Sequence, residues 1–124
     1  MSNFKDVTPA AALALIRKGA LLVDVREPNE IARKSFDVPN IMQIPLSRIE
    51  SRYQEIPANS QVIVACARGN RSLVAARFLT SHGYRKVINM QQGIARWERE
   101  GLPLNTRQQQ NFFSWLKQKL GGKS

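Results

Sequence analysis

The sequence predicts an α/β fold, in which a central, mostly parallel sheet of about five strands carries helices on both faces. The segments 21–25 and 62–65 are short, apolar and rich in β-branched residues, as expected of strands that are buried on both sides. Such segments alternate along the chain with stretches whose apolar residues follow the helical period. The 124 residues are enough for one domain with a core of its own.

The first half of the chain alternates between strand and helix signals. Thr8 and Pro9 have the residue types of a helix N-cap and a first helical position. In the helix that they begin, Leu13 and Ile16 should face inward. The predicted elements are, in order, a strand over 4–7, a helix over 10–18, a strand over 21–25, a short helix from 28 to about 34, a strand over 41–44 and a helix around 46–53.

The second half continues this alternation. Gly83 is a stop signal for the helix that begins at Ser72, and Trp97 should pack inward from a later helix. The only histidine, His82, falls at the end of the first of these helices. The predicted elements are a strand over 61–65, a helix over 72–82, a last strand over 84–88, a helix over 94–100 and a C-terminal helix from Thr106 to about Leu120.

Between the strand ending at Ala65 and the helix beginning at Ser72 lie six residues, Cys66 to Arg71. They include the only cysteine, a glycine and two arginines. A loop that runs from a strand into a helix N-terminus points backbone N–H groups inward, and the helix dipole adds positive charge. Such a loop favours a thiolate nucleophile and binds an anion. The alternative is that Cys66 is a small buried apolar residue.

Three segments resemble signatures of one family, the rhodanese-like sulfurtransferases. The loop Cys66-Ala67-Arg68-Gly69-Asn70-Arg71-Ser72 resembles the family's active-site loop. Asp24-Val25-Arg26-Glu27 resembles its first signature, and the segment 97–103 resembles its closing one. The resemblance covers roughly residues 4–104, and it implies a rhodanese-like domain over 1–104 with a C-terminal amphipathic helical extension over 105–124.

The resemblance implies sulfur transfer through a persulfide on Cys66. The donor would be thiosulfate or a protein persulfide, and the acceptor a thiol or a sulfur-carrier protein. Arg68 and Arg71 would attract and orient the anionic donor, Gly69 would let the backbone curl, and Ser72 would cap the helix. These residues and Asn70 form the expected substrate-binding loop. No cofactor and no metal site are expected.

Asp24 and Arg26 are the expected supporting residues. Asp24 interrupts an apolar strand, and a buried carboxylate needs a partner because an unpaired buried charge is costly. Arg26 follows on the same side of the chain. The pair either braces the loop at Cys66, since strand ends of a parallel sheet meet at one edge, or is a purely structural ion pair. A purely structural ion pair is favoured over a direct part in the chemistry. The resemblance favours a supporting role for the pair.

Two other functions are weighed against sulfur transfer. Related phosphatases and arsenate reductases on this scaffold have a loop one residue longer, whereas here Arg71 comes one position too early and Ser72 stands in its place. A non-catalytic rhodanese-like binding module is the other alternative, and the intact Cys66 argues against it.

The sequence departs from the family at two loops. Residues 34–40 replace the family's Gly-His-Ile-Pro-Gly-Ala segment. They keep only one feature of it, an apolar residue followed by proline, at Val38-Pro39. This loop should have a different shape. At residues 90–93 the family has paired glycines, and only Gly93 remains, so a less tight turn is expected.

Charge and composition bound the partners and the compartment. The net charge is +10, and residues 101–124 contribute four basic side chains and no acidic one. Such a surface attracts anions, but nucleic-acid binding is disfavoured because no nucleic-acid motif accompanies the charge. One cysteine cannot form an internal disulfide, and no apolar run approaches a membrane span. A cytoplasmic protein is therefore predicted.

The C-terminal helix leaves three possibilities open. Phe112, Phe113, Leu116 and Leu120 recur at helical spacing, with Trp115 on their flank and Lys117 and Lys119 on the other side. This apolar stripe could pack on the domain's own sheet, which is the first expectation. It could instead form a contact with a protein partner or a second copy. A peripheral membrane contact is possible but is not favoured.

Overall fold

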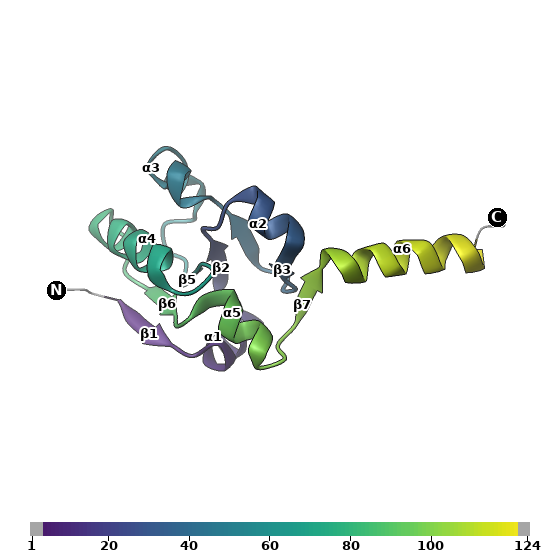
Figure 1. The fold of residues 1–124 in the computed structure, drawn as a ribbon. Coiled ribbons are helices and arrows are strands. Elements are labelled where there is room, and N and C mark those ends of the chain that lie inside the picture. Colours follow the sequence, from purple (N-terminus) through teal and green to yellow (C-terminus); the bar gives the residue numbers. More distant parts are fainter. Residues whose placement is uncertain (1–3, 122–124) are drawn as a thin grey trace.

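The computed structural model describes residues 4–121 as a sheet with helices on both faces and one projecting helix (Figure 1). Five strands form a sheet in the order β1–β6–β5–β2–β4, and every neighbouring pair is parallel. The predicted fold class is thus confirmed. The strands are β1 (Lys5–Val7), β2 (Leu21–Asp24), β4 (Ile41–Gln43), β5 (Val62–Ala65) and β6 (Val87–Met90).

Helices α1 and α5 cover one face of the sheet, and α3 and α4 cover the other. Strand residues alternate between these two cores, so that Leu22 and Ile63 face α1 and α5, while Val23 and Val64 face α3 and α4. The helices are α1 (Pro9–Arg17), α3 (Ile49–Arg52), α4 (Asn70–Ser81) and α5 (Gly93–Arg99), with 3₁₀ turns η1 (Leu46–Arg48) and η2 (Tyr53–Glu55) on either side of α3.

Several predicted local features are confirmed. The hydroxyl of Thr8 accepts a hydrogen bond from the Ala11 N–H at 3.2 Å, as an N-cap does. Leu13 and Ile16 are buried under the sheet. Trp97 is also buried, and its ring nitrogen donates to the carbonyl of Pro103 at 2.6 Å.

The strand predicted over 84–88 begins three residues later, at Val87, and ends two residues later, at Met90. Tyr84 is buried although it lies before the strand. Its hydroxyl donates to the carbonyl of Ile56 at 2.6 Å, which connects the segment before β6 to the end of η2. A residue that fills the core from a turn has the same composition signal as one in a strand, and this is why the prediction was wrong.

A second, two-stranded sheet was not predicted. Strand β3 (Lys34–Phe36) follows helix α2 (Pro28–Arg33) and pairs antiparallel with β7 (Leu104–Thr106). The pairing joins Lys34 to Thr106 and Phe36 to Leu104. The segment that departs from the family thus contacts the chain directly after residue 103, and β7 crosses the proposed boundary between residues 104 and 105.

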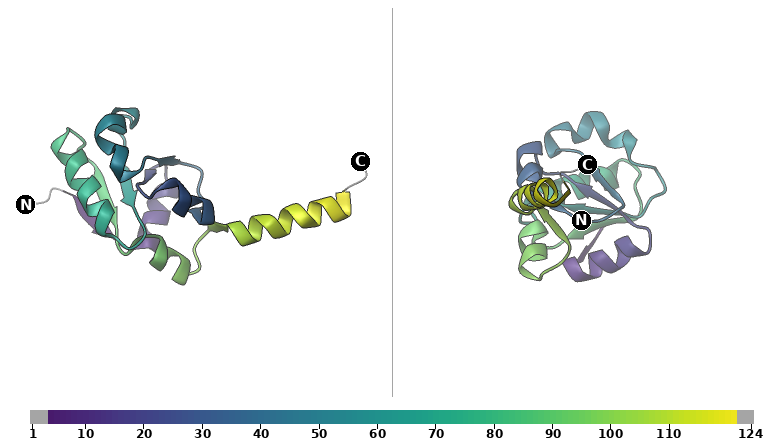
Figure 2. Two further views of the ribbon diagram at one scale, coloured as in Figure 1. Left: turned by 45° about the horizontal axis from the view of Figure 1, so that its top comes forward. Right: turned by 90° about the vertical axis from the view of Figure 1, so that its right-hand side faces the viewer.

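Helix α6 (Arg107–Gly121) projects away from the rest of the chain, as two views show (Figures 1 and 2). It meets the domain at β7 and α2. The expectation that its apolar stripe packs on the domain's own sheet is wrong, because Phe112 and Phe113 are 53% and 55% exposed. None of the helices within residues 4–121 is both long and apolar enough to span a bilayer.

Candidate active site

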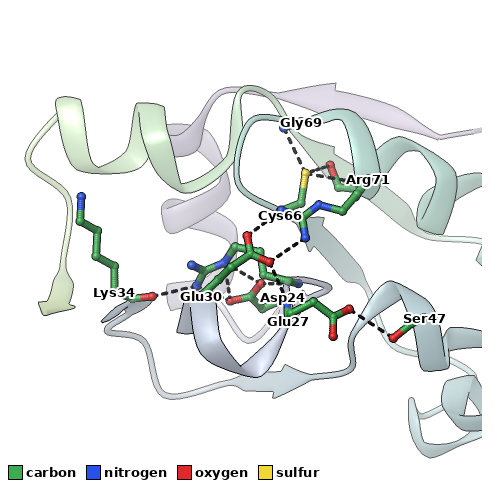
Figure 3. Close-up of polar contacts among 10 residues, drawn as sticks. Asp24, Glu27, Glu30, Lys34, Ser47, Cys66, Gly69 and Arg71 are labelled. Carbon is green, nitrogen blue, oxygen red and sulfur yellow. Dashed lines mark hydrogen bonds and ion pairs between the residues drawn. The ribbon is translucent and has the colours of Figure 1, made fainter. Parts of the chain in front are cut away.

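The loop that contains the cysteine lies at the carboxyl edge of the parallel sheet. It begins directly after β5, between the segments that follow β2 and β6, because neighbouring parallel strands end at the same edge. Cys66 is 1% exposed and forms the floor of this loop (Figure 3). The sequence therefore places one nucleophilic side chain at the edge where parallel sheets bind their ligands.

Backbone N–H groups surround the sulfur of Cys66. The N–H of Gly69 donates to Sγ at 3.1 Å, and the N–H of Ser72 donates to it at 3.3 Å. The Ser72 hydroxyl lies 3.4 Å from the same sulfur. Donors directed at one sulfur atom stabilise negative charge on it, whether as a thiolate or as a persulfide.

The position of Ser72 corrects the sequence analysis. The N-cap of α4 is Gly69, whose φ of +103° starts the helix at Asn70, two residues earlier than predicted. Ser72 therefore does not cap the helix. It lies in the first turn, fully buried, with its hydroxyl and its N–H beside the sulfur.

The first residues of α5 hold the loop from the opposite side. The N–H of Ile94 donates to the Cys66 carbonyl at 2.9 Å, and the N–H of Ala95 donates to the Ala67 carbonyl at 3.1 Å. Gln92, the N-cap of α5, and Gly93, its first residue, have φ values of +61° and +53°. Sequence reasoning missed this support, although the single glycine retained at residues 90–93 was a signal for it.

Arg71 is held by a carboxylate that the sequence analysis did not single out. Its guanidinium donates two hydrogen bonds to Glu30, at 2.7 and 2.8 Å (Figure 3). Glu30 also accepts the N–H of Glu27 at 3.0 Å, so helix α2 is fixed to the first turn of α4. The hydrogen bonds with Glu30 raise the pKa of Arg71, and the nearby Cys66 sulfur raises it further. The loop thus keeps a fixed cation next to the sulfur.

The Arg71–Glu30 pair makes stability depend on pH. The hydrogen bonds from Arg71 lower the pKa of Glu30 from 4.5 to about 2 in the folded chain. The stabilisation is therefore complete above about pH 4.5 and is lost as the pH falls towards 2, because the unfolded chain binds the proton first. Since about a third of each side chain is exposed, we expect about 1 kcal/mol. Urea unfolding across this range should show a flatter pH dependence for Glu30→Gln than for wild type.

The exposed pair between Arg52 and Glu55 is the matched control. Arg52 also lowers the pKa of Glu55 by hydrogen bonding, but these side chains are 38% and 49% exposed. Glu55→Gln should leave the acid limb of the stability curve close to that of wild type. Equal effects of the two substitutions would show that the Arg71–Glu30 pair contributes nothing specific.

Asp24 and Arg26 form a buried ion pair with each other. Arg26 Nη2 lies 2.7 Å from the Asp24 carboxylate, and the two side chains are 3% and 0% exposed. Arg26 also donates to the carbonyl of Lys34 at 3.0 Å, and its guanidinium lies over the ring of Phe36, 5.5 Å from the centroid. The pair joins β2 to β3, and the charge of Arg26 adds a small contribution to the lowered pKa of Glu30. The adjacent backbone reaches the cysteine loop directly, because the N–H of Val25 donates to the carbonyl of Ala65 at 2.9 Å.

Arg68 and Asn70 belong to the same loop but are at its surface. Both are exposed and line a shallow pocket of about 310 Å³ together with Gly69, Gln92 and Arg96. Among residues 4–121, Arg68 has no ion-pair partner, whereas Arg96 is paired with Glu100 at 2.6 Å. Arg68 is thus the loop arginine whose charge is available to an incoming anion.

The same described range contains no group of three or more His, Cys, Asp and Glu side chains that could hold a metal ion. The chemistry that this site offers is that of a single sulfur nucleophile. It is surrounded by N–H donors, with one fixed arginine and one exposed arginine on the same loop.

Comparison with known proteins agrees with this geometry. Residues 8–100 match the model of the rhodanese-like domain family. A sulfurtransferase of Allochromatium vinosum is 42% identical over 84 residues, which cover 68% of this chain and 77% of that protein. The thiosulfate sulfurtransferase GlpE of Pseudomonas syringae is 33% identical over 97 residues, which cover 78% and 90% of the two chains.

A solved structure shows the same fold. The crystal structure of a rhodanese-related protein from Thermoplasma volcanium superposes with a TM-score of 0.74 at 29% identity, and the match covers 82% of this chain and 98% of that one. With the family match over residues 8–100, the chain belongs to the rhodanese-like domain family.

Proposed function

We propose that the chain is a sulfurtransferase that carries a sulfane sulfur as a persulfide on Cys66. The observation that supports this most directly is the pair of N–H donors on the Cys66 sulfur, from Gly69 at 3.1 Å and Ser72 at 3.3 Å. Donors at this distance stabilise the anionic sulfur before attack and the anionic persulfide after it. Relatives named sulfurtransferase and thiosulfate sulfurtransferase add to this support.

The reaction proceeds in two displacements. In the first, the Cys66 thiolate attacks the outer sulfur of thiosulfate, the sulfur–sulfur bond of the donor breaks, and sulfite leaves with the electron pair. In the second, a nucleophilic acceptor attacks the terminal sulfur of the persulfide and regenerates the thiolate. Cyanide serves as a test acceptor and becomes thiocyanate, whereas a thiol or a sulfur-carrier protein is the acceptor that we propose in the cell.

The burial of Cys66 favours a donor that presents a single atom. With 1% of the residue exposed, the sulfur is reached end-on, which suits the terminal sulfur of thiosulfate or of a protein persulfide. A phosphate ester must instead be surrounded on three oxygens, for which the loop is one residue short. Exposed Arg68 would draw the dianionic donor towards the loop.

We also propose a cytoplasmic location, because a thiolate carrier works in a reducing compartment.

Intact-protein mass spectrometry after thiosulfate treatment tests the proposal. Wild type, kept free of reductant, should gain the mass of one sulfur atom and lose it again on addition of cyanide. Cys66→Ser should gain none, because its hydroxyl is a far weaker nucleophile. Lys86→Ala is the control variant, because this exposed residue follows α4 and should leave the gain in mass unchanged.

The alternative is a non-catalytic binding module. It predicts no added sulfur on wild type from thiosulfate or from a cysteine desulfurase loaded with persulfide. An adduct from the desulfurase alone would restrict the donor to a protein persulfide and keep the sulfurtransferase assignment. Hydrolysis of a phosphate ester that depends on Cys66, without any persulfide, would instead identify a phosphatase.

A further inference from the structure

Helix α6 exposes an apolar face that the domain does not cover. Among the residues of this helix, the exposed fractions are 53% for Phe112, 55% for Phe113, 51% for Trp115 and 77% for Leu120. The only other large hydrophobic side chain with comparable exposure in residues 4–121 is Val74 on α4. Exposed apolar surface is therefore concentrated on the helix that projects into solvent (Figure 2).

The apolar side chains share one side of the helix. At 100° per residue, the five residues from Phe112 to Leu120 that are aromatic or leucine fall within an arc of about 160°. Lys119 lies inside one edge of this arc, with its Nζ 6.0 Å from the centroid of the Trp115 ring, and so is not on the opposite side as the sequence analysis expected. Lys117 borders the other edge. Lysines beside or within an apolar face lay their stems along it and keep their charges in water.

Charge argues against a second copy as the occupant of this face. Residues 101–124 contain Arg107, Lys117, Lys119 and Lys123 and no Asp or Glu. Two α6 helices that met through this face would bring lysines together without a single carboxylate on either helix to pair with them. The surface that complements α6 must be apolar beneath the aromatic rings and anionic at their edges.

We propose that α6 lies in the plane of an anionic lipid surface, with its aromatic face among the acyl chains and its lysines at the headgroup phosphates. A lipid interface supplies both required properties at once, and Trp and Phe beside lysine are the residues that such helices use. The helix does not have to fold on binding, because Thr106 caps it through a hydrogen bond from the Gln109 N–H at 2.9 Å and β7 fixes its start to β3. The proposal is independent of the proposed sulfur transfer.

Sedimentation of the full chain with vesicles tests the proposal. One set of vesicles is phosphatidylcholine alone, and the other contains three parts phosphatidylglycerol to seven parts phosphatidylcholine. We expect at least tenfold tighter binding to the anionic set, weakened by high salt. The emission of Trp115 should shift to shorter wavelength on binding, while Trp97, which is 0% exposed, contributes a constant background.

Two pairs of variants separate the helix from the rest of the chain. Phe112→Ser with Phe113→Ser should lose at least tenfold in vesicle affinity, while Val74→Ser, which removes an equally exposed apolar side chain from α4, should lose none. Lys117→Glu with Lys119→Glu should also lose at least tenfold. Arg85→Glu with Lys86→Glu makes the same change in net charge on the exposed turn before β6 and should have a much smaller effect.

Four outcomes would overturn the proposal. The first is no preference for anionic vesicles in low salt, and the second is an equal loss of vesicle affinity in an α6 variant and in its control variant. The third is equally tight binding of polyglutamate that does not depend on Phe112 and Phe113. The fourth is a concentration-dependent dimer that shifts Trp115 emission without lipid. The third would indicate an acidic protein surface, and the fourth a second copy of this chain. Circular dichroism of each variant confirms that α6 is still helical, so that a loss of binding reports on the face itself.

Discussion

Replacing Asp24 by asparagine is expected to lower the free energy of unfolding by about 3 kcal/mol. The Asp24 carboxylate accepts hydrogen bonds from the Arg26 side chain at 2.7 to 3.2 Å and from the Arg26 N–H at 3.0 Å, and both side chains are buried. Asparagine keeps the volume but leaves the guanidinium charge buried without its counter-ion. Urea unfolding at neutral pH measures the loss.

Two comparisons identify the cause of this loss. Glu98→Gln removes a carboxylate from the exposed pair with Lys34, whose side chains are 42% and 47% exposed, and should cost less than about 1 kcal/mol. Asp24→Asn combined with Arg26→Met should recover part of the stability, because the unpaired charge is then gone. A double variant as unstable as the sum of the two single ones would show that charge pairing is not what stabilises this position.

The elements of the sheet could be predicted because their signal is local. A buried parallel strand such as β5 is apolar at every position, and the helix after it repeats apolar residues at helical spacing. The strand β6 was misplaced because Tyr84 contributes an apolar ring to the core from a turn. Strands β3 and β7 were missed because each has only three residues and pairs with a segment far away in the sequence, since Lys34 lies opposite Thr106 and Phe36 opposite Leu104.

The candidate site shows the same division between local and distant signals. The loop composition pointed to Cys66, Arg68, Gly69 and Arg71. The partner of Arg71 is Glu30, which lies 41 residues away, and no local pattern connects the two. The helix starts two residues earlier than predicted because Gly69 adopts a left-handed turn. That turn depends on the fold around it, so from the sequence alone Ser72 was assigned the capping role. Roles set by contacts between α2, α4 and α5 therefore require the structure.

The C-terminal helix could be predicted as an element, but its surroundings could not. Its start at Thr106 and its apolar residues follow from spacing and capping chemistry. Whether such a face packs inward depends on unoccupied surface elsewhere, and both faces of this sheet are already covered by α1, α3, α4 and α5. The helix therefore has no uncovered sheet face to pack on.

Replacing Gly93 by alanine is expected to have the largest effect on the cysteine loop. A Cβ at this residue would overlap the carbonyl oxygen of Cys66 and would lie 2.7 Å from the carbonyl carbon and oxygen of Ala67. These backbone atoms cannot swing aside as a flexible side chain can, because Ile94 and Ala95 hold the same two carbonyls by hydrogen bonds. We expect a loss of about 3 kcal/mol in unfolding free energy and about a hundredfold slower persulfide formation.

Gly101→Ala is the matched control for this substitution. Gly101 ends the same helix that Gly93 begins, and its φ of +73° is also left-handed, but a Cβ there meets nothing within 4 Å. Alanine at Gly101 should therefore cost only the backbone strain of about 1 kcal/mol and leave persulfide formation unchanged. Thermal unfolding and the rate of sulfur uptake from thiosulfate measure the two effects separately. If both variants lose stability and rate equally, backbone strain alone accounts for the loss, and the start of α5 does not hold Cys66 in place.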